Sequence, residues 1–372
     1  MVDSIPKSTD VFVVGGGPAG LATAIAARRR GLSVVVADGA VPPIDKPCGE
    51  GLMPDGLEAL HGLGVTIPEN ESYPFRGIRF VSDGRSAAAT FPRGVAYGIR
   101  RTNLHRVMMA AAAACGVGML WQTVVTGLHP DGVLVGGEAV RARWVVGADG
   151  TSSRVRHWAR LDEHQKKKLR FAFRRHYHVA PYTDFMELHW GRSCQIYVTP
   201  VAADQICVAL ISESPKLRLE DALGEFPELA GRLHGVEHAS TERGAITVNR
   251  KLRRVHGGRT VLVGDASGGV DAITGEGLCL AFRQAALLAD CLATGDVARY
   301  QREHRKLARR PALMARLMLA MAKRRFLRER IMRAFESSPG RFAGMLAMHV
   351  GAGSTRDYVS NGISLGWGLL HA

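Results

Sequence analysis

Glycine-rich turns that follow runs of β-branched residues carry the positions at which this chain could do chemistry. The first has the pattern G-x-G-x-x-G at Gly15, Gly17 and Gly20, and an alanine-rich stretch follows it. Gly15 can adopt the backbone angles of a tight turn, Gly17 lets a ligand approach the main chain, and Gly20 lets a helix pack closely on the strand. The free N–H groups at the start of that helix, beside Pro18 and Ala19, would then face an anion such as a pyrophosphate.

A second apolar strand, residues 34–38, ends in an acid. At this place in a βαβ unit the carboxylate of Asp38 would accept hydrogen bonds from a ribose. Because strand, helix, second strand and acid follow in the expected order, the sequence predicts dinucleotide binding. The alternatives are a glycine turn that only packs a helix on a sheet, and a secretory signal, against which Asp10 and the interrupting glycines argue.

The same pattern returns twice later in the chain. Residues 144–156 read as an apolar strand, a glycine turn with Asp149, and the start of a helix, and residues 259–265 read as a strand that ends in Gly264 and Asp265. Three such strand ends converge on one long ligand better than on three separate ligands. They therefore predict a single extended ligand-binding site.

A fourth glycine-rich stretch runs from Thr274 to Leu278, with Gly275 and Gly277 in it, and precedes a helix that is expected to start near Glu276. A flavin dinucleotide has the length that this arrangement requires. The first turn would hold its pyrophosphate and the Gly-Asp turn its ribityl chain. The N-terminus of the helix would point at the pyrimidine end of the isoalloxazine, where its partial positive charge would stabilise the anionic reduced flavin.

A loop and an arginine complete the expected binding residues. Residues 39–52 are too rich in proline and glycine for a helix or strand, and a long ordered loop after a nucleotide-binding unit is more often functional than idle. Within it, Cys48 beside Gly49 could touch substrate or flavin, or could be a small buried thiol. Arg101 starts a helix for which Thr102 is the expected cap. An arginine there opposes the helix dipole, which favours a second role such as contact with a phosphate.

These motifs resemble those of a large group of flavin enzymes related to aromatic hydroxylases, squalene and styrene epoxidases, halogenases and geranylgeranyl reductases. Residues 15–20 match the group's fingerprint, residues 147–156 its Asp-Gly motif and residues 263–266 its Gly-Asp motif, and Arg101 resembles its arginine that contacts the flavin nucleotide. The resemblance covers about residues 8 to 295. It implies non-covalent FAD, reduced by NADPH or NADH without a separate nicotinamide domain.

Different motifs resemble different branches of this group. Residues 46–52 and 274–278 resemble loops of geranylgeranyl reductases, whereas Tyr-Val-Thr-Pro at 197–200 resembles the hydroxylases, although the proline that many hydroxylases carry after Gly-Asp is missing. The resemblance favours a monooxygenase that uses NAD(P)H and molecular oxygen, through a C4a-hydroperoxyflavin, to hydroxylate an aromatic or lipid-tailed secondary metabolite. The alternatives are an FAD-dependent reductase of polyprenyl double bonds, and a non-enzymatic flavin-binding protein that docks on a membrane.

Two groups of residues are candidates for catalysis. The main-chain N–H groups of Gly275, Glu276 and Gly277 would be in place before charge develops on the flavin, although an acid at the start of a helix is favourable in any case. His176 and His178 share one face of an expected strand, and one of them could deprotonate a phenol. The alternative is a pair of sheet-surface residues beside basic neighbours.

The order of elements predicts an α/β fold: a Rossmann-like FAD-binding domain with an inserted antiparallel β-sheet substrate domain and a helical C-terminus. Four β segments between residues 169 and 212 have no helix between them, which indicates a separate sheet. The expected boundaries are residues 1–75, 96–160 and 245–295 for the FAD-binding domain, 76–95 and 161–244 for the substrate domain, and 296–372 for a basic helical region.

Composition and charge limit the kinds of partner that the chain could bind. The 372 residues carry a formal net charge of +15, and basic residues far outnumber acids between Arg299 and Arg333. An expected helix there places apolar residues on one face, Leu313, Met314, Leu317, Met318 and Met321, with basic residues elsewhere. Such a helix could lie on an anionic membrane, cover a lipid-like substrate, or pack on the substrate domain. Nucleic acid is disfavoured because no aromatic platform accompanies the charge.

The six cysteines form no C-x-x-C pair and have no histidine spacing that suits zinc, so no metal site is expected. Free thiols in a reducing cytoplasm are the default, and no uninterrupted apolar run of about twenty residues is present to span a bilayer. We therefore expect a cytoplasmic protein, with peripheral attachment to the inner face of the membrane as an open alternative.

Overall fold

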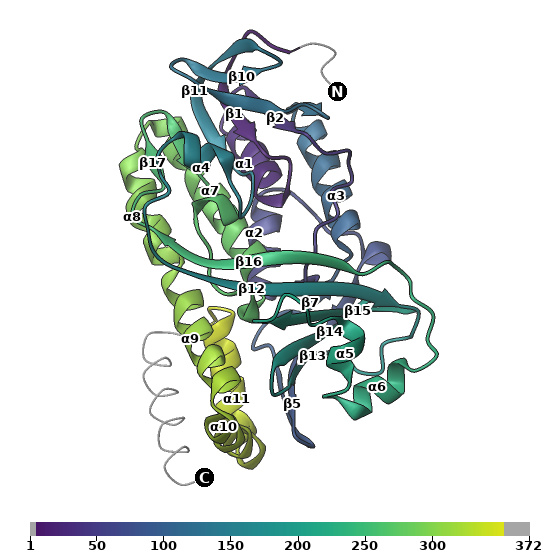
Figure 1. Ribbon diagram of the computed structural model, residues 1–372. Helices are drawn as coiled ribbons and strands as arrows, with labels where there is room; N and C mark the ends of the chain where they lie inside the picture. Colours follow the sequence, from purple (N-terminus) through teal and green to yellow (C-terminus); the bar gives the residue numbers. More distant parts are fainter. Residues whose placement is uncertain (1–4, 353–372) are drawn as a thin grey trace.

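The computed structural model describes residues 5–352, in which a first sheet, which carries the glycine turns, lies at one end and a second sheet crosses the middle (Figure 1). The first sheet is parallel in its centre. In spatial order its parallel strands are β18 (Thr260–Leu262), β11 (Glu138–Gly147), β1 (Ser8–Val14), β2 (Val34–Asp38) and β8 (Gly118–Trp121). Antiparallel strands are added at its margins: β17 (His256–Gly257), β10 (Gly132–Val135) and β9 (Val125–His129).

Helix α1 (Pro18–Arg28) packs against α3 (Arg101–Ala114) and α7 (Gly277–Thr294). Val11 to Val14 in β1 are buried, which explains why a central parallel strand reads as a continuous apolar run and not as an alternating one. The α/β class predicted from the sequence is confirmed. Helix α7 is long and apolar enough to cross a membrane by those two criteria, but more than half of it is buried inside the protein.

The second sheet has seven strands. In spatial order they are β16 (Arg243–Leu252), β12 (His164–Tyr177), β15 (Gln205–Ser212), β14 (Cys194–Ala202), β13 (Phe185–Trp190), β5 (Gly77–Ser82) and β6 (Arg85–Thr90). All neighbours are antiparallel, as expected for the segments between residues 169 and 212, except β13 and β5, which run parallel. Strands β5 and β6 arrive from a separate part of the chain, so no hairpin fixes their direction relative to β13.

Strand β16 also crosses the boundary that was expected between residues 244 and 245. It pairs along β12 from Arg174 back to His164, and it leads into the first sheet. One long strand is therefore both an edge of the second sheet and the connection between the two sheets. Periodicity along the sequence cannot reveal such a shared role.

Shorter elements surround the junction of the two sheets. A small third sheet contains β3 (Gly51–Leu52), β7 (Ala96–Gly98) and β4 (Tyr73–Phe75), so the stretch at 39–52 ends in a short strand and is not a loop throughout. The remaining short helices are α2 (Pro54–Gly62), η1 (Glu69–Glu71), α4 (Arg154–Trp158), α5 (Leu219–Leu223), α6 (Pro227–Leu233), η2 (Gly264–Ser267) and η3 (Ala272–Thr274).

The C-terminal helices are α8 (Val297–Leu307), α9 (Arg309–Lys323), α10 (Arg325–Ser337) and α11 (Pro339–His349). Helices α9 to α11 cover one face of the second sheet at the lower left of Figure 1. Met318 and Phe342 share a hydrophobic cluster there with Phe80 and Trp190 from the sheet. The helical character of the region is confirmed up to His349, and residues 353–372 lie outside the described part.

Candidate active site

A cavity of about 910 Å³ lies where the two sheets meet, and the glycine turns of the first sheet line it. Most residues that were expected to bind FAD lie on its wall: Gly15, Gly17, Pro18, Ala19, Asp38, Cys48, Gly49, Arg101, Asp149, Gly264, Asp265, Gly275, Gly277 and Leu278. Five candidate residues do not line this cavity: Gly20, Thr274, Glu276, His176 and His178. The turns that are far apart in the sequence thus share one cavity.

The glycines of the first turn have different roles. Gly15 has a φ of 110°, and a Cβ there would lie 2.5 Å from the carbonyl oxygen of Ala148. A Cβ on Gly20 would overlap the carbonyl oxygen of Gly15, so Gly20 serves the close packing of helix on strand. A Cβ on Gly17 would meet no atom nearer than Arg101 Nη2, at 4.0 Å. Gly17 is therefore the position that is open toward the cavity.

Asp38 and His105 hold this turn from two sides. The Oδ2 atom of Asp38 accepts the N–H of Gly16 at 2.7 Å, and Nε2 of His105 lies 2.9 Å from the Gly16 carbonyl oxygen. Burial lowers the pKa of His105, so its neutral ring can donate one hydrogen bond to that carbonyl. Sequence reasoning missed His105, because only its place on α3 brings it to the turn.

Asp149 lines the cavity, but its carboxylate is used within the protein. One oxygen accepts the hydroxyl of Ser153 at 2.5 Å, and the other accepts the N–H groups of Arg154 at 2.7 Å and Val155 at 3.1 Å. The carboxylate therefore satisfies free N–H groups at the start of α4. These hydrogen bonds fix the shape of the turn.

Asp265 faces the cavity as an ionised carboxylate. Its Oδ2 lies 3.1 Å from Nζ of Lys46 and 3.1 Å from the hydroxyl of Thr151. Burial alone would raise the pKa of this carboxyl, but the Lys46 ammonium and the Thr151 hydrogen bond outweigh it and lower the pKa. Lys46, which had no expected role of its own, thereby joins the 39–52 segment to the Gly-Asp turn.

Arg101 provides an observation that points to a phosphate. Its guanidinium lies beside Gly17, and its buried Nε has no hydrogen-bond partner among residues 5–352. A buried donor without a partner is costly, and an anionic oxygen would satisfy it. The main-chain N–H of Arg101 donates to Oε1 of Glu50 at 2.9 Å, so Glu50 caps the start of α3 and the expectation that Thr102 does so is wrong.

The start of α7 presents its main chain to the cavity. Gly275 has a φ of 67°, and a Cβ on Gly275 or Gly277 would meet no atom within 4 Å. The positive end of α7, an 18-residue helix, therefore has open space in front of it, where negative charge would be stabilised. This arrangement fits the pyrimidine end of an isoalloxazine, as expected from the sequence.

The side chain of Glu276 points elsewhere. It is 2% exposed, its Oε1 lies 3.2 Å from Nη2 of Arg310, and its Oε2 lies 3.6 Å from Nδ1 of His349. Burial at the N-terminus of α7 is tolerated because these basic groups on α9 and α11 surround the carboxylate. Glu276 thus anchors the C-terminal helices. A catalytic side chain was expected to enter the cavity, and that of Glu276 does not.

One row of side chains across the second sheet holds the loop that carries Cys48 and Gly49. The strand register places His176 opposite Cys207, and Cys207 opposite Thr199. The hydroxyl of Thr199 donates to the Gly49 carbonyl at 2.7 Å, and Sγ of Cys207 lies 3.7 Å from the Cys48 carbonyl oxygen. The loop is therefore clamped to the sheet, so its position over the cavity is fixed.

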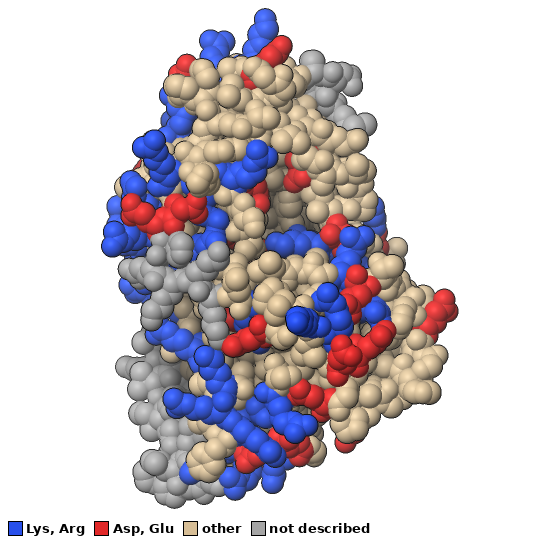
Figure 2. All heavy atoms as spheres, in the orientation of Figure 1, with Lys and Arg blue, Asp and Glu red and all other residues tan. Residues whose placement is uncertain are grey.

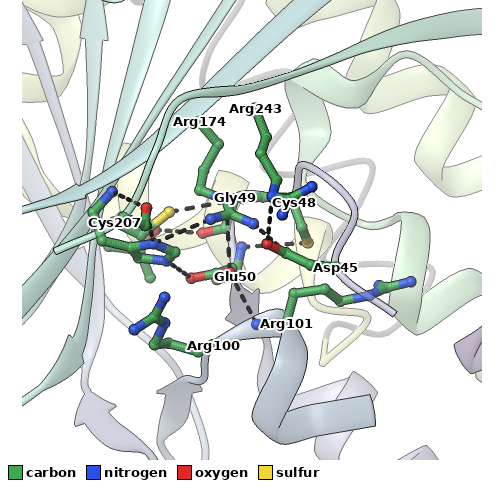
Figure 3. Close-up of polar contacts among 12 residues, drawn as sticks. Asp45, Cys48, Gly49, Glu50, Arg100, Arg101, Arg174, Cys207 and Arg243 are labelled. Atoms are coloured by element: carbon green, nitrogen blue, oxygen red, sulfur yellow. Dashed lines mark hydrogen bonds and ion pairs between the residues drawn. The ribbon is translucent and has the colours of Figure 1, made fainter. Parts of the chain in front are cut away.

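His176 completes this row and is buried, so the alternative that placed it on the surface of the sheet is wrong. Its Nε2 lies 2.6 Å from Oε2 of Glu50, and its Nδ1 lies 3.1 Å from Nη1 of Arg174. A guanidinium only donates, so Nδ1 accepts and Nε2 carries the proton that is donated to Glu50. Asp45 lies between Arg174 and Arg243, 2.8 Å from Nε of the latter, and closes the network (Figure 3).

His178 does not share this environment. Strand β12 ends at Tyr177, so His178 lies exposed beyond the strand, and the expectation that both histidines face the site is wrong. Burial raises the pKa of Cys48, which therefore stays a thiol and not a reactive thiolate. Within the described residues, Glu50, His176 and Cys207 could in principle surround a metal ion, but the short hydrogen bond between the first two already pairs their ligand atoms.

Part of the cavity wall is apolar and includes Met53, Met186 and Ile211. Arg174 also lies on this wall, and its side chain is only 1% exposed. Its two terminal nitrogens donate to Asp45 and His176, and its buried Nε, which makes no hydrogen bond in the described part of the chain, lies 3.8 Å from Oε1 of Glu50. The cavity wall thus contains one guanidinium N–H that makes no hydrogen bond within the described residues and that a ligand oxygen would accept.

Comparison with known proteins agrees with this geometry. A family model described as an FAD binding domain matches residues 8–299. The chain is 27% identical to a menaquinone reductase of Mycobacterium tuberculosis (80% of this chain, 79% of the relative) and 26% identical to a ubiquinone hydroxylase of Neisseria meningitidis (77% and 69%). It is 28% identical to a digeranylgeranylglycerophospholipid reductase of Methanothermobacter thermautotrophicus (81% and 82%).

Solved structures share the fold at lower sequence identity. A flavoprotein/dehydrogenase from Cytophaga hutchinsonii superposes with a TM-score of 0.79 at 18% identity, over 92% of this chain and 93% of the other. A geranylgeranyl bacteriochlorophyll reductase-like protein from Thermoplasma acidophilum gives 0.72 at 21% identity, over 84% and 88%.

The family match spans most of the chain, and the residues present fit the cofactor: open glycines at two helix N-termini, and the unpartnered donor of Arg101 beside one of them. The relatives are named as reductases and hydroxylases, which sets aside the non-enzymatic alternative. The chain therefore belongs to the FAD-binding domain family and is an FAD-dependent oxidoreductase of the hydroxylase or prenyl-reductase type.

Proposed function

We propose that this protein is a monooxygenase that uses NADPH or NADH and molecular oxygen to hydroxylate an oxygen-bearing aromatic ring with a lipid-like tail. The observation that carries the proposal is the buried Nε of Arg174 on the cavity wall, which lies 3.8 Å from Oε1 of Glu50 and makes no hydrogen bond among the described residues. A phenol or quinone offers an oxygen to that donor, whereas an isolated prenyl double bond does not. The donor thus favours a ring substrate over a purely hydrocarbon one.

The names of the relatives support the tail. Menaquinone and ubiquinone are rings with isoprenoid chains, and the third relative is named for a digeranylgeranyl lipid. In this chain Met186 and Tyr197 line both the large cavity and a small apolar pocket under α9 and α11. Methionine side chains adapt their shape, so these walls suit a flexible hydrocarbon chain next to the ring.

Bound FAD would supply hydride acceptance and oxygen activation. The tasks left to the chain are to bind, orient and exclude water. Gly17 and Arg101 would hold the pyrophosphate, and the N–H groups at the start of α7 would stabilise negative charge on the ring system. Arg174 would hold the substrate oxygen as an anion, which makes the ring richer in electrons. Glu50 and His176, by pairing with each other, keep the loop over the cavity in place.

Isotope labelling tests the proposal. Purified protein with FAD and NADPH or NADH is incubated under ¹⁸O₂ with a long-chain alkylphenol, and the product is analysed by mass spectrometry. One ¹⁸O atom in the product is the expected result. A substrate oxidation that leaves ¹⁸O only in water or hydrogen peroxide would contradict hydroxylation.

A reductase of polyprenyl double bonds is the second candidate, because both reductase-like loops contribute to the cavity wall, through residues 46–51 and through Gly275, Gly277 and Leu278. The same assay with a digeranylgeranyl lipid under nitrogen separates the candidates. A gain of two hydrogens per double bond, with no oxygen requirement, would assign the reductase. Full dependence on oxygen would assign the monooxygenase.

A further inference from the structure

The outward faces of α9 and α10 carry cations that are not neutralised within the protein. We call these cations, together with two apolar side chains among them, the basic surface. It consists of the exposed residues Arg309, Leu313, Arg316, Lys323, Arg324, Phe326 and Arg333. At 100° per residue, Arg309, Leu313, Arg316 and Lys323 fall on one stripe of α9. Figure 2 shows Lys and Arg side chains gathered over α9 and α10, toward the lower left of the view.

The acids near α9 and α10 do not neutralise the cations of the basic surface, because each acid is paired with a basic residue outside that surface. Glu303 pairs with Lys306 at 2.7 Å and Glu329 with Arg325 at 2.7 Å. Glu336 pairs with Arg85 of β6 at 2.6 Å. Among residues 5–352 none of the cations in the basic surface has an ion-pair partner, so their charge is directed outward.

Two large apolar side chains lie among these cations. Leu313 is 61% exposed and Phe326 is 66% exposed. The sequence placed Leu313 with Met314 and Met318 on the apolar face, but it points to the opposite side from them, with Arg316. Exposed apolar side chains surrounded by cations are typical of surfaces that insert into the headgroup region of a bilayer.

The helices that bear the basic surface are fixed to the protein by their inner faces. Arg310 is 2.8 Å from Asp55, and Arg328, which is 2% exposed, donates to the Ser82 hydroxyl at 3.0 Å. Met314 and Met318 pack into the core beneath. The inner faces of α9 and α10 are therefore occupied, whereas the exposed side chains of their outer faces are not covered by any other part of residues 5–352.

We propose that the basic surface docks the protein on an anionic lipid bilayer. Charge complementarity attracts the cations to acidic headgroups, and Leu313 and Phe326 reach the acyl boundary. Duplex nucleic acid would also attract the cations, but it would leave both apolar side chains without a favourable contact. Docking would make the protein peripheral on the inner face of the membrane. The proposal does not depend on which reaction the enzyme performs.

Co-sedimentation with vesicles tests the surface. The full chain with FAD bound is mixed with vesicles of equal parts phosphatidylglycerol and phosphatidylcholine, or of phosphatidylcholine alone. Binding to the first and not to the second is expected, with weakening at high salt. The double substitution Arg316→Glu, Lys323→Glu should lower the partition coefficient roughly a hundredfold. Phe326→Ser should weaken the binding that persists at high salt.

A matched control lies on the other sheet: Arg141→Glu reverses an exposed charge on β11 and should bind vesicles like the wild type. Retained FAD absorbance shows that each variant is folded. Truncation from Arg299 onward is a poor test, because it removes Tyr300, whose buried hydroxyl donates to the Leu262 carbonyl at 2.9 Å. Equal vesicle binding by control and double variant would overturn the proposal. So would failure of the wild type to bind anionic vesicles, or tighter binding to duplex DNA than to vesicles.

Discussion

The two glycines on either side of Pro18 and Ala19 should respond oppositely to the same substitution. Gly17 precedes α1 with φ −70° and ψ 177°, which alanine adopts without strain, and its Cβ would have Arg101 Nη2 at 4.0 Å as nearest neighbour. Gly20→Ala would instead drive a methyl group into the Gly15 carbonyl and place it 3.1 Å from the carbonyl carbon. One substitution therefore fills ligand space, and the other fills space between strand and helix.

The magnitudes follow from these contacts. Alanine is less favourable than glycine at an N-cap, but it also restricts the unfolded chain. Because these effects oppose each other, the free energy of unfolding of the Gly17→Ala apoprotein should lie within about 0.5 kcal/mol of the wild-type value. The methyl group keeps the pyrophosphate from the N–H groups of α1. Loss of one charge-assisted hydrogen bond costs about 1.5–3 kcal/mol, or roughly a 10- to 150-fold rise in the FAD dissociation constant. Gly20→Ala should destabilise the apoprotein by about 3 kcal/mol, because two main-chain segments must separate.

Two measurements decide the matter. Urea unfolding of FAD-free protein, followed by circular dichroism, gives the free energy of unfolding, and titration of flavin fluorescence gives the dissociation constant. Wild-type FAD affinity in Gly17→Ala would refute the assignment of this turn to the pyrophosphate. A Gly20→Ala apoprotein as stable as the wild type would refute the packing role.

Three further predictions concern other polar side chains of the protein. Burial lowers the pKa of His304 to about 4, from 6.5 in an unfolded chain, so about 3 kcal/mol of stability should be lost as pH falls from about 6.5 to 4. In unfolding experiments His304→Gln should flatten this pH dependence, and an unchanged pH dependence would contradict the assignment to His304. Glu276→Ala should lower the free energy of unfolding by about 3 kcal/mol, because Arg310 loses one of its partners, while FAD affinity stays unchanged. Loss of FAD affinity at wild-type stability would instead show a direct role of Glu276 in FAD binding. His176→Ala should raise the FAD dissociation constant roughly tenfold by releasing Glu50, whereas the exposed His178→Ala should not; equal effects of the two would count against the clamp.

Much of the fold was accessible from local patterns. The strand, glycine turn and helix around Gly15 to Gly20 are recognisable because each residue type has a local conformational reason to be there. The cofactor turns could be brought together because parallel strands present the same ends at one edge of a sheet. The direction of β5 beside β13 and the continuation of β16 depend on how distant segments pair, which periodicity does not encode.

The roles of buried polar side chains were harder to foresee. Glu50 lies between two glycines with a φ of 58°, a backbone conformation that places its carboxylate between the start of α3 and His176. The sequence showed the flanking glycines but not these partners. Glu276 was misjudged for the same reason, since the basic groups that face its carboxylate are far along the chain. Exposure of His178 follows from where β12 ends, and the last residue of a strand is poorly defined by pattern.

A crystal structure of the protein with FAD tests the central claim most directly, which is that one flavin dinucleotide extends from the glycines of α1 to the start of α7. Difference density is expected with the pyrophosphate at Gly15 to Gly17 beside Arg101, and with the pyrimidine edge of the isoalloxazine against Gly275 and Gly277. Density for FAD outside this cavity, or colourless crystals after soaking with FAD, would contradict the claim.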